Sequence, residues 1–164
     1  MSLRPIALLS AFAVLGCAGP KSQVLQDAGE FPSHRCVGVA PFVDPRGRGQ
    51  AVADAIEAAL QQRMFEPVDQ KALADVLVAN MPDRTSRLGL EALEKIRAKS
   101  PVDAILFGRL TPDWSAAMIT VNETETGVPI LQAVLLPRDR KAAFSDADDV
   151  AREAVRVLTS LRRQ

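Results

Sequence analysis

Histidine, cysteine and tyrosine are scarce in this sequence, and their scarcity limits the chemistry it can perform. The 164 residues include one histidine, two cysteines and no tyrosine. A Cys/His metal cluster therefore has too few ligands. The single histidine, His34, has no second histidine with which to form a metal site or a base-plus-orienter pair. We expect His34 to be exposed, and we expect a protein that is not an enzyme and carries no metal or cofactor.

Charge of one sign is not in excess either. Lysine and arginine number 20, aspartate and glutamate also number 20, and the formal net charge is zero. This balance excludes a generally basic nucleic-acid binder and an acidic disordered chain. Apolar residues make up 48% of the sequence, which is typical of one globular domain at this length. After residue 17, no run approaches the roughly 20 apolar residues that span a bilayer.

The N-terminus has the pattern of a secretory signal. Arg4 supplies one positive charge, and the residues from Ile6 to Leu15 carry none. This apolar run of about ten residues is too short for a membrane span and matches the core of a signal peptide. Residues 14–17 read Val-Leu-Gly-Cys and resemble the lipobox of bacterial lipoproteins.

The lipobox resemblance implies a signal peptide over residues 1–16 and a diacylglycerol on the thiol of Cys17. Further acylation, with palmitate as a typical chain, would anchor the protein firmly, because several acyl chains bind a bilayer far better than one. Ala18 is not the aspartate that resembles an inner-membrane retention signal, so we expect the periplasmic face of the outer membrane. The alternative is ordinary signal cleavage, with Cys17 unmodified.

The remaining sequence predicts a short tether and one domain. Gly, Pro and polar residues without clear periodicity make residues 17–34 a lipidated cysteine followed by a tether. Residues 35–164 form the single α/β domain. Periodicity predicts strands at 35–42, 66–68, 103–108, 116–122 and 128–136, and helices at about 49–63, 72–80, 90–99 and 145–163. We expect a mixed sheet of about five strands flanked by helices.

Several motifs then resemble a known family. The segment from Val37 to Asp44 is similar to the opening of periplasmic lipoproteins related to the curli-secretion protein CsgG. That opening also occurs in the TolB N-terminal domain and in activator lipoproteins of penicillin-binding proteins. The run from Val102 to Gly108 is continuously apolar after Asp103, which predicts a strand buried on both faces. Gly127 can supply the positive φ that a hairpin turn needs. Both segments also resemble the family's motifs.

The resemblance implies an α/β domain with no enzymatic activity. We expect an outer-membrane lipoprotein that binds another envelope protein in assembly or secretion. The alternative is an oligomeric ring subunit of a CsgG-like secretion complex. The expected partners are the membrane, through the anchor on Cys17, an envelope protein and, in the alternative, further copies of the chain. No nucleic acid is expected.

Trp114 is the one aromatic side chain singled out as a binding candidate. It follows the turn sequence Thr-Pro-Asp, and it is the only tryptophan in the chain. Two interpretations stay open, since a tryptophan here either covers the core or anchors a partner protein. Cys36 opens an apolar run, so we expect a small buried thiol and no reactive group.

Charged residues near predicted strand ends have simple structural explanations. Asp44, Asp69 and Asp103 lie where aspartate commonly caps turns, and we favour that role over acid–base catalysis. The Gly-Arg-Gly sequence at 47–49 lacks the remaining residues of a nucleotide-binding loop and indicates a turn. Arg138, Arg140 and Lys141 form a small basic cluster, which we expect to be a solvated loop.

Overall fold

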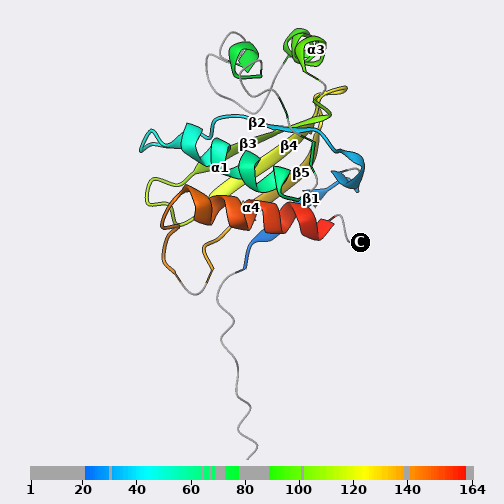
Figure 1. Ribbon diagram of the computed structural model, residues 1–164. Coiled ribbons are helices and arrows are strands. Elements are labelled where there is room, and N and C mark those ends of the chain that lie inside the picture. Colours follow the sequence, from blue (N-terminus) through cyan, green and yellow to red (C-terminus); the bar gives the residue numbers. More distant parts are fainter. Residues whose placement is uncertain are drawn as a thin grey trace, which may run out of the picture.

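The chain folds into a mixed five-stranded sheet with helices on both sides. The computed structural model describes residues 21–29, 31–63, 65–66, 68, 73–77, 89–100, 102–138 and 141–161. The strands are β1 (Gln23–Asp27), β2 (Val37–Val39), β3 (Ala104–Leu110), β4 (Ala117–Glu123) and β5 (Pro129–Leu135). The helices are α1 (Gly49–Gln61), α3 (Leu90–Lys99) and α4 (Ala147–Leu161), with a short 3-10 turn η1 (Phe31–Ser33) and helical residues 73–77 (Figure 1). The predicted α/β fold is confirmed.

The strand order is β1-β5-β4-β3-β2. β2 runs parallel to β3, whereas the β3–β4, β4–β5 and β5–β1 pairs are antiparallel. Leu106 lies in the middle of the sheet, opposite Val39 of β2 and Val121 of β4. Gly127 has a φ of 71° in the β4–β5 turn, the left-handed conformation that the sequence predicted there. Pro129 is the first residue of β5, where its missing N–H costs least.

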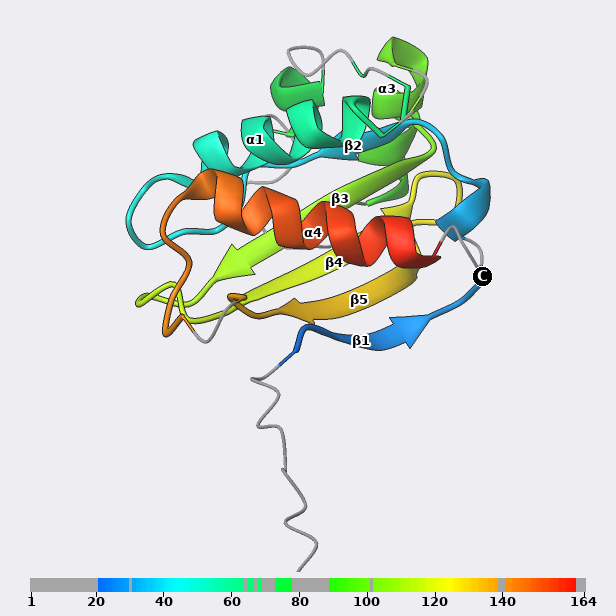
Figure 2. The ribbon, with the colours of Figure 1, turned by 60° about the horizontal axis from the view of Figure 1, so that its bottom comes forward.

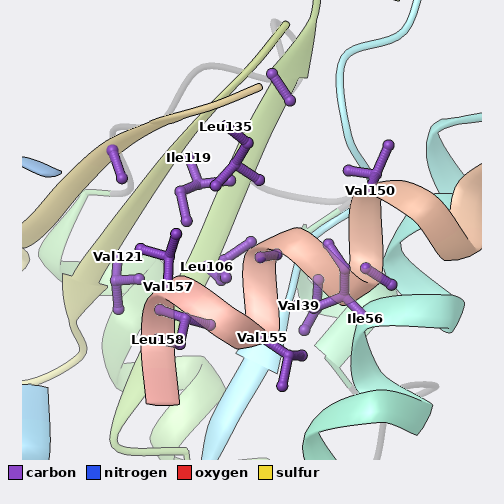
Figure 3. Packing of buried hydrophobic residues seen from close by; sticks show 14 of the residues in the cluster. Val39, Ile56, Leu106, Ile119, Val121, Leu135, Val150, Val155, Val157 and Leu158 are labelled. Atoms are coloured by element: carbon purple, nitrogen blue, oxygen red, sulfur yellow. The ribbon is translucent and has the colours of Figure 1, made fainter. Parts of the chain in front are cut away.

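Helices α1 and α4 pack side by side on one face of the sheet (Figure 2). Alternate strand residues point toward them, because neighbouring side chains of a strand face opposite sides. Figure 3 shows Leu106, Ile119 and Leu135 of the sheet in one cluster with Val157 and Leu158 of α4. All of these side chains are buried, and they form the larger of two hydrophobic clusters.

The second hydrophobic cluster lies on the opposite face and covers less of the sheet. Ile105 and Phe107 of β3 pack there against α3 and helical residues 73–77; the helical contributors are Leu73, Val76, Leu77, Leu93 and Ile96. β3 is therefore buried on both faces, as its unbroken apolar run predicted. Among the described residues, this cluster includes none from β4, β5 or β1, and Met118 of β4 is 53% exposed.

The predicted tether is wrong over much of its length. Gln23–Asp27 forms the edge strand β1, paired with β5, and Phe31 of η1 is fully buried against Phe65. All five side chains of β1 are exposed, so the strand lacks the apolar alternation by which strands are recognised. The folded domain therefore begins before residue 35. Cys17 and residues 1–16 lie outside the described residues.

The strand predicted at 66–68 is also absent from the described part of that segment, residues 66 and 68. A backbone hydrogen bond from the Glu66 amide to the Arg35 carbonyl joins this segment to the chain just before β2. Across the described ranges, no helix has the length and hydrophobicity needed to cross a bilayer.

Candidate functional site

Trp114 lies in the loop between β3 and β4, and its side chain is fully buried. The core-covering interpretation is therefore confirmed, and Trp114 exposes no ring surface for the partner contact that the sequence also allowed. Its φ of 64° is unusual for a bulky residue. The carbonyl of Trp114 accepts a 2.8 Å hydrogen bond from the Phe144 amide, which ties this loop to the chain before α4.

Asp44 holds the indole of Trp114 from the loop before α1. Its carboxylate accepts hydrogen bonds from the indole Nε1–H at 2.9 Å and from the backbone amides of Arg46 and Arg48 at 3.0 and 2.8 Å. Partial desolvation raises the pKa of Asp44, but these hydrogen bonds and the positive charge of Arg48 outweigh it, so the pKa lies below its ordinary value. Asp44 is thus the turn-capping residue that its position predicted.

Arg46 and Arg48 lie on the ring that Asp44 fixes. The Arg48 guanidinium carbon is 3.8 Å from the centroid of the Trp114 ring, and that of Arg46 is 5.8 Å away. Arg46 also donates from Nε to the Pro112 carbonyl at 3.1 Å. Both arginines are exposed, and neither forms an ion pair within the described residues. We call these two side chains on Trp114 the arginine platform.

The loop that carries the platform is closed tightly at both ends. Gly47, at a φ of 73°, donates its amide to the Asp44 carbonyl in the predicted turn. Gly49 begins α1 and approaches the backbone of Phe42 so closely that an added Cβ would lie 1.8 Å from the Phe42 oxygen. Only glycine fits there, because any side chain would collide with the Phe42 backbone.

A second polar feature surrounds His34. The cavity has a volume of about 460 Å³ and is lined by Ser33, His34, Arg97, Ser100, Val102, Asp103, Glu123, Thr124 and Glu125. His34 is buried, and its Nε2 lies 3.6 Å from Oε1 of Glu123. The prediction of an exposed histidine is wrong, because η1 folds against the sheet instead of belonging to a tether. The Ser100 hydroxyl is buried and has no hydrogen-bond partner among the described residues.

The residues around this cavity have structural roles. Oδ2 of Asp103 accepts the amides of Arg35 and Cys36, each at 3.0 Å, which is the turn-capping role predicted for it. Cys36 is buried, as predicted, and burial together with the Asp103 and Glu66 charges raises the pKa of its thiol. Within the described ranges, no three or more His, Cys, Asp or Glu side chains are placed to hold a metal ion. Asp69 lies outside the described residues.

The predicted basic loop is paired with acidic residues of α4. Arg138 contacts Glu153 at 3.2 Å and Lys141 contacts Asp149 at 3.1 Å, around a cavity of about 210 Å³. The prediction of a solvated loop therefore missed the ion pairs of Arg138 and Lys141 with α4. Arg140 lies outside the described residues. Glu153 is almost completely buried and also accepts hydrogen bonds from Ser22 and Arg156.

Comparison with known proteins finds similarity of fold to a solved structure. No family model matches the chain, and no curated protein matches it. Among solved structures, it is similar to a PelC dodecamer from Paraburkholderia phytofirmans in space group P6, with a TM-score of 0.52 and 12% identity. That match covers 87% of this chain and 96% of the PelC chain. A substituted PelC dodecamer from the same organism, in space group C2, gives 0.45 and 14%, over 72% and 80% of the two chains. The likeness concerns the fold.

Sequence reasoning identified Trp114 and Asp44 separately but did not place them together. Seventy positions separate them, and only the arrangement of β3 beside the loop before α1 brings the indole N–H to the carboxylate. The platform arginines were part of a turn-rich segment without any signal for stacking. A possible signal was their spacing, since Arg46 and Arg48 flank the glycine of a tight turn.

Proposed function

We propose that this protein is a non-enzymatic lipoprotein on the periplasmic face of the outer membrane, anchored through Cys17. It acts in envelope assembly or secretion as a homo-oligomer that binds another envelope protein. The observation that supports the oligomer is the fold, which is similar to that of the subunit of a PelC dodecamer. The similarity covers 87% of this chain and 96% of the PelC chain. This favours the ring-subunit alternative over a solitary binding protein.

Features of the folded chain support this proposal. Leu25 of β1 is 58% exposed and Met118 of β4 is 53% exposed, in the part of the sheet outside the second cluster. β1 is also an edge strand, whose outer backbone groups have no strand beside them in the described sheet. Edge strands and exposed apolar side chains are surfaces that other chains can bury.

Acylation of Cys17 is tested directly by exchanging each of the two cysteines. We expect wild-type protein to incorporate labelled palmitate and to sediment with outer membranes. Cys17→Ser removes the acceptor thiol, so the protein should lose the label and leave the membrane fraction. Cys36→Ala is the matched control, because this thiol is buried in the domain and should not affect labelling.

Crosslinking in intact envelopes, before fractionation, tests whether the protein binds copies of itself and another envelope protein. Wild-type protein should give adducts with itself and with one recurrent envelope protein, and Cys17→Ser should give fewer of both. A Cys17→Ser protein that still carries palmitate contradicts the anchor. A correctly labelled wild type that forms no protein adducts contradicts the role in assembly.

A further inference from the structure

The positive charge of the arginine platform is balanced only in part by the folded chain. The charge of Arg48 lowers the pKa of Asp44, but neither arginine forms an ion pair within the described residues. Near α4, exposed basic side chains form ion pairs: Arg138 with Glu153, and Lys141 with Asp149. Arg46 and Arg48 instead stack on a buried ring, and the carboxylate beneath them accepts the Trp114 indole and two backbone amides. Two guanidinium groups are thus held in place facing solvent, which is the arrangement that binds phosphate groups well.

The platform lies at the end of the sheet where the chain leaves toward Cys17. The register places the start of β1, the end of β5, the start of β4 and the end of β3 at the same end of the sheet. Gln23 pairs with Val134, Val134 with Met118, and Met118 with Arg109. The loops before α1 and between β3 and β4 occupy this same end, on the left in Figure 2. The His34 cavity lies at the opposite end, beside the β4–β5 turn.

The chain between the anchor and the domain is short. Ser22 is already fixed to the domain, since its hydroxyl donates to Glu153 and accepts the Leu136 amide. The four residue steps from Cys17 to Lys21 span at most about 14 Å, whatever their conformation. If Cys17 is acylated, this end of the domain must stay within that distance of the bilayer surface.

We propose that Arg46 and Arg48 bind the phosphate groups of anionic phospholipids and so set the orientation of the domain on its membrane. This inference rests on the anchor in the proposed function. Trp114 is a positioning residue, because it holds both guanidinium groups without touching lipid. Lys21, which is exposed at the same end, adds to the attraction. Phosphate rather than an acidic protein is favoured because the tether brings a phospholipid surface to this end of the sheet.

The test measures vesicle binding by the unacylated chain, residues 18–164, which contains every described residue. Trp114 is the only tryptophan, so its emission reports on the platform itself. Vesicles of phosphatidylethanolamine and phosphatidylglycerol are compared with phosphatidylcholine vesicles and with free inorganic phosphate. The variant is Arg46→Gln with Arg48→Gln. The matched control, Arg35→Gln with Lys99→Gln, removes the same charge from exposed residues at the other end of the sheet.

Wild-type protein should bind the anionic vesicles and change its tryptophan emission, and salt should weaken the binding. Each basic group near an anionic surface strengthens binding about fivefold, so the platform variant should bind roughly 25-fold more weakly. The control pair should stay within about twofold, because its charges lie beyond the screening length of about 10 Å from the surface. Thermal melts of both variants confirm that they are folded.

Equal losses in the two variants, or equal binding to phosphatidylcholine, would overturn the proposal. A change in emission with free phosphate but no vesicle binding would also overturn it, and would assign the platform to a soluble phosphate compound. Binding to vesicles here does not depend on acylation. Failure of the platform therefore leaves the palmitate result unaffected, and failure of the anchor leaves this result unaffected.

Discussion

Trp114 shows what a residue's local sequence reveals and what it conceals. A tryptophan in a Thr-Pro-Asp-Trp turn fits equally well on a protein surface and over a core, and only its partners decide between them. Those partners, Asp44, Arg48 and Phe144, come from distant parts of the chain. The single-residue roles that depend on neighbours in sequence, such as turn capping by Asp44, were predictable for that reason.

Truncation of Trp114 measures how much the buried ring contributes to the stability of the domain. We expect Trp114→Ala to lower the free energy of unfolding by about 3–5 kcal/mol, since it leaves a large cavity. Trp114→Phe keeps most of the ring but leaves the Asp44 carboxylate without the indole N–H, which should cost about 1–3 kcal/mol. Denaturant titration followed by circular dichroism gives both values. An alanine variant as stable as the wild type would show that the ring is not part of the core.

At the scale of the elements, hydrophobic periodicity predicted the helices and strands that bury side chains, and it missed the strand whose side chains are exposed. α1, α3 and α4 and the strands β3, β4 and β5 all have buried stripes or alternating faces, and all were predicted close to their observed bounds. β1 escaped because none of its five side chains is buried. Its pairing with β5 depends on backbone hydrogen bonds, which leave no trace in the hydrophobic pattern.

Two truncations test whether β1 belongs to the domain or to a tether. A chain that begins at Lys21 should melt cooperatively as a soluble protein. A chain that begins at Phe31 loses β1 and the Ser22 contacts, and exposes the edge of β5, so we expect a lower melting temperature and aggregation. The comparison uses thermal melts and size-exclusion chromatography. If both chains melt at the same temperature, β1 is only a tether, as the sequence first suggested.

At the scale of the whole molecule, composition and element order were sufficient to predict a single α/β domain with a mixed sheet. They could not reveal that α3 and helical residues 73–77 cover only the β2–β3 side of the second face. Exposed Met118 and Val128 look in sequence like any other strand residues, because exposure is a property of the packed molecule. These exposed apolar side chains therefore became visible only in the folded chain.

The native mass of the mature, acylated chain in mild detergent tests the central claim most directly. The full 164-residue chain has a mass of 17.7 kDa, and the proposed removal of residues 1–16 would leave a smaller subunit. We predict one discrete oligomer in native mass spectrometry or light scattering, with the twelve copies of the PelC dodecamer as the reference. A species that stays monomeric at every concentration, while still folded and acylated, would contradict the account.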